Sequence, residues 1–386
     1  MSRFSLSVLL ALSFAASLVC SAAHAQDKKT IKIGAIYPMT GSASFLGIPE
    51  DKALRMKVDE VNAAGGINGH KLEVITYDTE GNGTKAVQHV RRLVESDKVD
   101  VVFGPSSSGE GLQTIEIVNE SKVPQIAHGG TEKLVNPTTK YVFNSVPTDR
   151  VALSYVLSWF KKKGFKTIAL MSSADGYGQS GKNVLESLLP EYGMKITTAE
   201  EFNRQDADMT AQVLRAKQSN ADVMLIWSAL PAPTIIARNA QAVGYGKPIV
   251  VGYGAASNEL VEKAGAAGEG VYISSFRLLA PGSLSEQDPV RPVTLKLFAD
   301  YYAKYREAPA NFAQHSHDAF LILQQAIKGI KGPVTRDSLR DAIEKVEVIG
   351  ANGRFRFSAT DHGGLDTTSN PLVMLQWVKG KWQVAS

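Results

Sequence analysis

The stretch VDVVFGPSSSGEGLQTIEIVNESKVPQIA, Val99–Ala127, decides the fold class. Its first residues, Val99–Gly104, form a short apolar run typical of a buried strand, and Val123–Ala127 is another. Between them, Gly109–Ser121 carries apolar residues at helical spacing and follows a row of serines, a residue type that caps helices. A strand, a helix and a second strand in this order predict a parallel sheet with helices on its faces.

The same alternation continues on both sides of this stretch. The first unit has predicted strands at Ile31–Tyr37, Leu72–Tyr77, Val99–Gly104, Val123–Ala127 and Tyr141–Val146, and helices at Pro49–Ala64, Thr84–Glu95 and Gly109–Ser121. The second has helices at Arg150–Lys163, Gly181–Glu191, Met209–Gln218 and Pro233–Val243, and strands at Thr167–Ser172, Lys195–Glu201, Asp222–Trp227, Ile249–Gly252 and Gly270–Phe276. Two doubly wound α/β units are therefore expected.

The remainder of the chain follows the second unit. A polar surface loop is predicted over Pro281–Pro292, then helices over Val293–Tyr305, Phe312–Ile330 and Arg336–Val346, then strands over Arg354–Phe357, Leu372–Val378 and Lys381–Val384. The 386 residues suffice for more than one core. With 42 Lys and Arg against 38 Asp and Glu, the chain carries too little net charge for a disordered protein or a dedicated nucleic-acid binder.

The first 25 residues have the pattern of a cleaved signal peptide. Arg3 precedes an apolar segment, Leu6–Val19, and Ala23–Ala25 has small residues at both ends, as export cleavage sites do. The one cysteine, Cys20, lies in this segment; lipoprotein processing there is disfavoured because Val19 is not small. No later apolar stretch is long enough to span a membrane. A periplasmic protein without disulfides is expected.

Candidate binding groups follow the strands, because ligands of parallel α/β sheets bind beyond the carboxyl ends of the strands. Ser106–Ser108 combine hydroxyls with helix N-terminal amides, a cradle for an anion, although plain N-capping explains serines equally well. Gly129 and Gly130 allow close backbone approach after the next strand. Tyr177, flanked by glycines, can lie over a bound group or form an ordinary turn.

Catalytic and metal signatures are missing from the sequence. Gly104-x-Ser106-x-Ser108 lacks the final glycine of a nucleophile elbow, and no Walker A or dinucleotide-binding pattern occurs. His315 and His317 are two residues apart, so on a helix they face different directions, and no metal-ligand spacing is present. We therefore expect no enzyme activity, no cofactor and no metal site.

Several motifs, in their order, resemble those of one family. They are Ile33-Gly34-x-x-Tyr37-Pro38-x-Thr40-Gly41, Asn62-Ala63-Ala64-Gly65-Gly66-Ile67-Asn68-Gly69, Gly104-Pro105-Ser106-Ser107-Ser108, Tyr177-Gly178 and Gly353-Arg354-Phe355-x-Phe357. The chain resembles the periplasmic substrate-binding proteins of branched-chain-amino-acid-type ABC transporters, the type I or Venus flytrap fold. The resemblance implies two Rossmann-like lobes joined by three crossover strands, a ligand in the cleft between them, a membrane permease as partner and a monomeric state. The lobes would comprise residues 27–148 with 277–357 and residues 149–276 with 358–386.

The resemblance also implies roles for individual residues. Ser108 matches the serine that binds the ligand carboxylate, Gly129 serves the ligand through its backbone, and Tyr177 closes from the second lobe. Asp149 matches an acidic residue near the first crossover. The full set of expected ligand contacts is Phe45, Leu46, Ser107, Ser108, His128, Gly129, Gly130, Thr131, Asp149, Tyr177, Leu230, Tyr253 and Gly254.

Two departures from the family pattern concern the ligand. The amino-acid binders carry an acidic residue after the strand that here ends at Gly252, but this chain continues Tyr253-Gly254-Ala255-Ala256-Ser257. An expected aromatic is replaced by Ala229-Leu230-Pro231. A buried ammonium without a counter-charge would cost several kcal/mol. We therefore expect a carboxylate ligand without an α-amino group, an aromatic or other hydrophobic acid.

Three alternatives remain open from the sequence. An amino-acid ligand is possible if Asp149 or Glu259 supplies the counter-charge. A ligand sensor of the same fold would bind in the same way but report to a receptor. A serine hydrolase would use Ser106 or Ser108 as nucleophile with His128 as base, and turnover of the ligand would reveal it.

Overall fold

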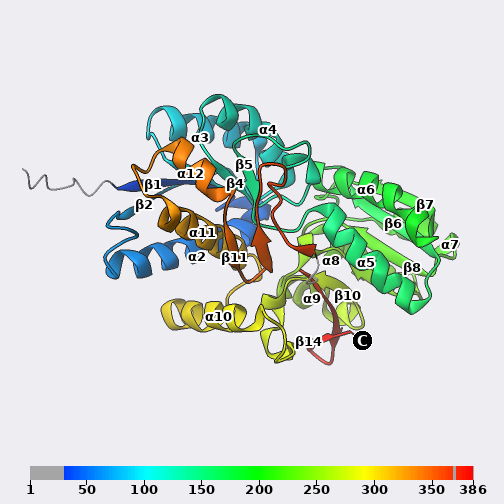
Figure 1. The fold of residues 1–386 in the computed structure, drawn as a ribbon. Coiled ribbons are helices and arrows are strands. Elements are labelled where there is room, and N and C mark those ends of the chain that lie inside the picture. The colour runs from blue at the N-terminus through cyan, green and yellow to red at the C-terminus, as the bar shows by residue number, and fades with distance from the viewer. Residues whose placement is uncertain (1–29, 368–370, 386) are drawn as a thin grey trace, which may run out of the picture.

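The computed structural model describes residues 30–367 and 371–385, which form two large sheets side by side (Figure 1). The predicted signal peptide, residues 1–25, lies outside the described residues. The first sheet has the order β2-β1-β3-β4-β5 and is parallel throughout. Its strands are β1 (Ile31–Tyr37), β2 (Leu72–Asp78), β3 (Val101–Phe103), β4 (Gln125–Ala127) and β5 (Val142–Asn144).

Alternation along the strands of the first sheet creates two apolar layers. Val101 and Phe103 pack with helices α2 (Ser44–Ala63), α11 (Ala313–Gly329) and α12 (Arg336–Ile343). Val102 points to the other face, where α3 (Gly83–Glu95) and α4 (Ser108–Glu120) cover it. Both faces are therefore buried, as all-parallel sheets require.

The second sheet is built in the same way with an antiparallel edge. Its order is β14-β13-β10-β9-β8-β6-β7. The strands are β6 (Thr167–Ser173), β7 (Lys195–Phe202), β8 (Val223–Trp227), β9 (Ile249–Val251), β10 (Tyr272–Ser275), β13 (Val373–Val378) and β14 (Lys381–Val384). Helices α5 (Asp149–Lys163) and α6 (Gly176–Tyr192) cover one face, and α7 (Thr210–Gln218), α8 (Ala232–Ala242) and α9 (Asn258–Ala264) cover the other.

The chain passes between the two sheets three times (Figure 1). It leaves β5 for α5, returns from β10 towards α10 (Arg291–Tyr305) and α11, and leaves β12 (Arg354–Arg356) for β13. These connections confirm the predicted fold class of two doubly wound lobes. None of the helices in the described ranges is long and apolar enough to cross a bilayer.

Two helices begin earlier than the sequence predicts. Helix α2 starts at Ser44, so Pro49 lies inside it and not at its first turn. A single proline removes only one helical hydrogen bond, and the buried residues around it, including Glu50, hold the helix in place. Helix α6 starts at Gly176 and not at Gly181, because the Asp175 carboxylate accepts hydrogen bonds from the amides of Tyr177 and Gly178.

The end of the chain contains two further differences. The predicted helix to Val346 ends at Ile343, and an unexpected strand, β11 (Glu347–Ile349), pairs with β12. The segment 281–292 is not wholly a surface loop. It contains the buried residues Leu284 and Val290 and the first residues of α10, and Asp288 accepts a 2.6 Å ion-pair contact from buried Arg277.

Candidate functional site

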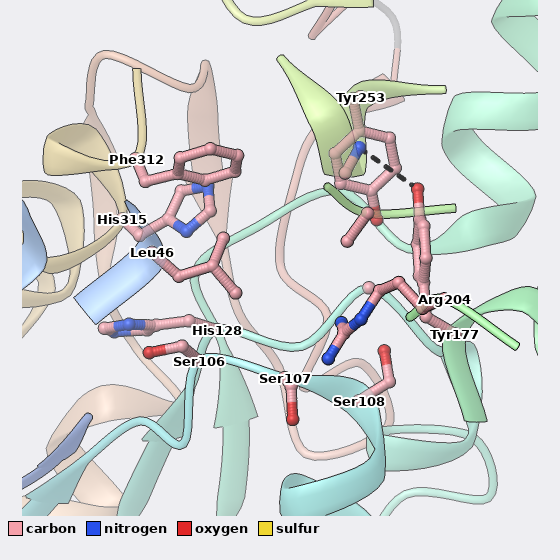
Figure 2. A pocket seen from close by; sticks show the side chains of 13 residues that line it. Leu46, Ser106, Ser107, Ser108, His128, Tyr177, Arg204, Tyr253, Phe312 and His315 are labelled. Carbon is pink, nitrogen blue, oxygen red and sulfur yellow. Dashed lines mark hydrogen bonds between the residues drawn. The ribbon is translucent and has the colours of Figure 1, made fainter. Parts of the chain in front are cut away.

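A cavity lies between the carboxyl ends of the two sheets, where parallel α/β folds bind ligands. Residues following the first sheet and on α2 and α11 form its N-side wall: Leu46, Ser106, Ser107, Ser108, His128, Gly130, Phe312 and His315. Residues following the second sheet form its C-side wall: Tyr177, Arg204, Ala229, Tyr253 and Gly254. Figure 2 shows the two walls facing each other. The cavity volume is only about 50 Å³, so the walls stand close together.

The structure brings most of the expected contacts to this cavity. Those that line it are Leu46, Ser107, Ser108, His128, Gly130, Tyr177, Tyr253 and Gly254. Those that do not line it are Phe45, Gly129, Thr131, Asp149 and Leu230. Ser106, part of the predicted serine cradle, also lines the cavity. Lining residues that the sequence does not predict as ligand contacts are Arg204, Ala229, Phe312 and His315.

The residues that do not line the cavity have structural contacts of their own. Phe45 packs edge-on against Phe312, with ring centroids 5.4 Å apart. The Thr131 hydroxyl is 2.7 Å from that of Ser180 on α6, so it links the first unit to the second. Leu230 is buried in the core of the second sheet. These residues support the walls and leave the cavity surface to their neighbours.

Asp149 is fully buried at the first turn of α5, where hydrogen bonding from Ser180 and Trp227 offsets the effect of burial on its carboxylate only in part. Its backbone amide donates to the Gly130 carbonyl, 2.6 Å away. Burial raises the pKa of this carboxyl well above its usual range. The carboxyl is therefore biased towards its neutral form, which is a poor counter-charge for an ammonium.

The N-terminus of α4 presents hydrogen-bond donors to the cavity. The Ser107 hydroxyl caps the helix and donates to the Glu110 carboxylate at 2.5 Å. The Ser108 hydroxyl oxygen accepts from the Thr131 amide at 3.1 Å, which leaves its own O–H free to donate to a ligand. The first amides of a helix lack intrahelical acceptors. Ser108 therefore places a hydroxyl and a helix N-terminus together beside the cavity.

Arg204 adds a positively charged side chain to the cavity lining. It lies between β7 and α7, and in Figure 2 its guanidinium is directed towards Ser107 and Ser108. Its contact with Asp175 is long, 3.6 Å from Nη1 to Oδ2. The guanidinium therefore has N–H donors that this contact leaves unused, and guanidinium groups pair well with anions. Sequence reasoning missed it because nothing in the local pattern distinguishes Arg204 from any loop arginine.

A buried carboxylate stands behind the opposite end of the N-side wall. Glu50, fully buried on α2, accepts a hydrogen bond from the Ser106 hydroxyl and another from His315 Nδ1 at 3.0 Å. His128 Nδ1 is 3.3 Å from the same Oε1 atom. Burial alone would raise the pKa of Glu50, but the adjacent imidazoles of His128 and His315 lower it to about 2. Glu50 is therefore ionised.

This cluster is the one group among the described residues in which three potential metal-ligand atoms lie within 4.8 Å of one another. Its members come from α2, the segment after β4 and α11, so their spacing along the chain gives no sign of it. The Glu50–His315 hydrogen bond accounts for its arrangement. Ser106 donates to Glu50 and Ser108 accepts from Thr131, so neither serine is paired with His128 as a hydrolase nucleophile would be.

The C-side wall is aromatic. The Tyr177 ring stacks on buried Trp227 at 5.4 Å and meets Tyr253 edge-on at 5.8 Å. The Tyr177 hydroxyl accepts a hydrogen bond from the Gly254 amide, drawn in Figure 2. Tyr253 reaches across to the first unit and donates to the Pro147 carbonyl at 2.9 Å. The packed rings provide an apolar surface that faces the N-side wall.

Comparison with known proteins agrees with this architecture. A family model described as "Periplasmic binding protein" matches residues 30–381. The chain belongs to this family. Leu/Ile/Val-binding protein homolog 7 of Brucella suis biovar 1 is 25% identical over 390 residues, covering 97% of this chain and 94% of the relative.

Two solved structures are similar over almost the whole molecule. An extracellular ligand-binding receptor from Rhodopseudomonas palustris HaA2 superposes with a TM-score of 0.85 at 27% identity, covering 92% of this chain and 99% of the other. The branched-chain amino acid transporter substrate binding protein LivJ from Streptococcus pneumoniae, solved in complex with isoleucine, gives a TM-score of 0.80 at 27% identity, covering 92% and 99%.

These findings confirm the resemblance drawn from the motifs. The chain is a periplasmic binding protein of the Leu/Ile/Val-binding type, a class of extracytoplasmic proteins that bind small molecules. Proteins of this family and fold are substrate-binding proteins and not enzymes.

Proposed function

We propose that this protein captures a small carboxylate that lacks an α-amino group, most suitably an aromatic or other hydrophobic acid, and delivers it to an ABC-transporter permease. The lobes, residues 27–148 with 277–357 and residues 149–276 with 358–386, would close on the ligand by a hinge motion at their connections. The ligand would dock first on the N-side wall and then be covered by the C-side wall.

The observation that carries this proposal is the charge of the cavity wall. Among the described residues that line the cavity, Arg204 is present and Asp and Glu are absent. Glu259, one candidate counter-charge for an ammonium, is bound to Lys263 at 2.5 Å on α9 and lies outside the lining. Asp149, the other, does not line the cavity and is biased to its neutral form. A carboxylate is therefore favoured and an ammonium is disfavoured.

The second candidate is an amino-acid ligand, because LivJ from Streptococcus pneumoniae was solved with isoleucine. It requires an anionic group that reaches the ligand amine. Of the described lining residues only tyrosine and serine hydroxyls, backbone carbonyls and imidazoles could meet an ammonium here. Such groups compensate a buried ammonium less well than a carboxylate does.

The test is a thermal-shift and calorimetric screen of ligand-stripped protein. The panel pairs benzoate, phenylacetate and phenylpyruvate with phenylalanine, leucine and valine. A ligand at about 100 times its Kd adds roughly 2.7 kcal/mol of stability. We expect shifts with the acids and none with the amino acids. Shifts with the amino acids alone would overturn the proposal in favour of the second candidate.

A further inference from the structure

Two buried imidazoles at one end of the cavity have ring nitrogens without partners. His128 and His315 both line the cavity, and each is nearly or fully inaccessible to solvent. Nε2 of each has no hydrogen-bond partner among the described residues. Buried polar atoms are normally hydrogen-bonded, so two orphaned nitrogens beside a cavity point to a ligand group that satisfies them.

Glu50 fixes what His315 offers. The ionised carboxylate of Glu50 only accepts hydrogen bonds, so His315 Nδ1, at 3.0 Å, must carry the proton that it shares with Glu50. Burial lowers the pKa of His315, an effect that the contact with Glu50 offsets only in part. In this neutral tautomer Nε2 carries a lone pair. It accepts a hydrogen bond, and the adjacent carboxylate strengthens it as an acceptor.

The surroundings of these imidazoles are apolar rings. His315 meets Phe312 edge-on at 5.4 Å and Phe276 edge-on at 5.2 Å. Leu46 lies beside it on the N-side wall (Figure 2). In the same view the imidazoles are at the opposite end of the wall from Ser108 and Arg204. A ligand bound by its carboxylate at Ser108 would therefore place its far end among rings and a hydrogen-bond acceptor.

We propose that Glu50, His315 and His128 form a hydroxyl-binding subsite, and that the ligand is an aromatic acid with a hydroxyl group at the end opposite its carboxylate. The hydroxyl donates its proton to His315 Nε2, and its oxygen accepts a hydrogen bond from the N–H of His128 Nε2. This inference rests on the proposed function, since it assumes that a carboxylate occupies the Ser108–Arg204 end. It narrows the ligand class from aromatic acids to phenolic ones.

The experiment compares matched pairs of acids by calorimetry on the wild-type protein, in buffer containing EDTA. The pairs are 4-hydroxybenzoate with benzoate, 4-hydroxyphenylacetate with phenylacetate, and 4-hydroxycinnamate with cinnamate. The 4-methoxy acid of each series keeps the oxygen on the ring but has no O–H, so it tests whether the hydroxyl must donate a hydrogen bond. We expect at least one hydroxy acid to bind about tenfold tighter or more than both its unsubstituted and methoxy partners.

A His315→Leu variant then assigns the effect, with His89→Leu as the matched control, because the His89 ring bonds the Asp78 carbonyl away from the cavity. We expect the hydroxyl preference to disappear in H315L and to persist in H89L. Circular dichroism and the affinity for the unsubstituted acid show whether H315L is folded.

Different failures have different meanings. If the unsubstituted acids bind and no hydroxy acid binds more tightly than its unsubstituted partner, the proposal of a hydroxyl-binding subsite is overturned and the proposed function stands. If no aromatic acid binds, the proposed function itself fails. Retention of the preference in H315L would also overturn the subsite. So would stoichiometric Zn²⁺ binding that H315L abolishes, because the imidazole lone pairs would then serve a metal.

Discussion

The N-side wall of the cavity is held by hydrogen bonds among its own polar side chains, whereas the C-side wall consists of packed rings and one arginine. Ser106 and His315 both hydrogen-bond to the Glu50 carboxylate, and the Ser108 hydroxyl accepts a hydrogen bond from the Thr131 amide. Across the cavity, Tyr177 and Tyr253 are positioned mainly by ring contacts.

In the proposed function, the N-side wall recognises the ligand and the C-side wall closes over it. Directional hydrogen bonds hold the N-side groups before a ligand arrives, so little reorganisation is needed to bind. Ring contacts are less directional than hydrogen bonds, so the C-side wall can cover ligands of different shapes. Arg204 adds a positive charge to this wall. Variants on the two walls should therefore fail in different ways.

The largest effect is expected where the walls meet. A Cβ at Gly130 would lie 2.0 Å from the Tyr253 hydroxyl, so Gly130→Ala should keep the walls apart without disturbing the first sheet. We expect binding to weaken by roughly 100-fold or more, with the melting temperature nearly unchanged. Calorimetry measures the affinity, and small-angle scattering should show an open form with saturating ligand.

Gly109→Ala is the matched control, since a Cβ there meets nothing within 4 Å. Gly109 lies beside the same cavity at the start of α4. Wild-type affinity in G130A would show that the walls do not approach as described.

The next effect concerns stability on the N-side wall. The pKa of Glu50 is lowered to about 2 from an ordinary value of 4.5, so its ionised form stabilises the fold above about pH 4.5. That contribution, about 3 kcal/mol, is lost as the pH falls from 4.5 towards 2. Glu50→Gln should therefore unfold more easily than wild type at pH 7, and the gap should close by about pH 2.

Urea unfolding at a series of pH values measures this gap. Glu60→Gln serves as the control, because that carboxylate is half-exposed in its pair with Lys57 on the same helix. A gap between E50Q and wild type that stays constant with pH would contradict the assignment of the charge to Glu50.

The third prediction concerns a residue of the C-side wall and its contribution to ligand affinity. Arg204→Gln removes the positive charge at the anion site, so carboxylates should bind about 10- to 100-fold more weakly. The unfolding free energy should hardly change, since the side chain is paired only loosely with Asp175. The corresponding neutral amides should bind R204Q and wild type alike.

Arg215→Gln, on the neighbouring helix α7 and outside the cavity lining, controls for a general loss of positive charge. Equal losses in both variants would mean that long-range attraction, and not a contact, favours the carboxylate.

The sequence predicts the sheets more completely than the site. Strand β1 and helix α5 match their apolar patterns to within a residue, because periodicity records which face is buried. Helix α2 was placed too late, since Pro49 has the signature of a first turn. Tertiary packing around Glu50 outweighs that local signal.

The site was predicted where it depends on chain-local features. Ser107, Ser108 and Gly130 lie in the segments that follow two strands, where sequence reading expects ligand contacts, and the family pattern adds Ser108. Arg204 and His315 contribute from segments that no local motif connects with the serines. Only the closeness of α11 to α2 and the position of the β7–α7 loop bring them together, and neither is encoded in residue spacing.

The smallest expected effect, a gain of stability, tests the buried carboxyl of Asp149. The pKa of Asp149 is raised by burial, so its contribution to stability is greatest at low pH and is lost as the pH rises above the ordinary value of 3.8. Asp149→Asn, which keeps the shape without an ionisable group, should be as stable as wild type at pH 4 and more stable at pH 7 and above. Ligand affinity should stay within a few-fold, because Asp149 does not line the cavity. Urea unfolding at both pH values shows whether the substitution raises or lowers the free energy of unfolding. A loss of stability at pH 7, together with a loss of amino-acid binding, would instead make Asp149 the ionised partner of a ligand amine.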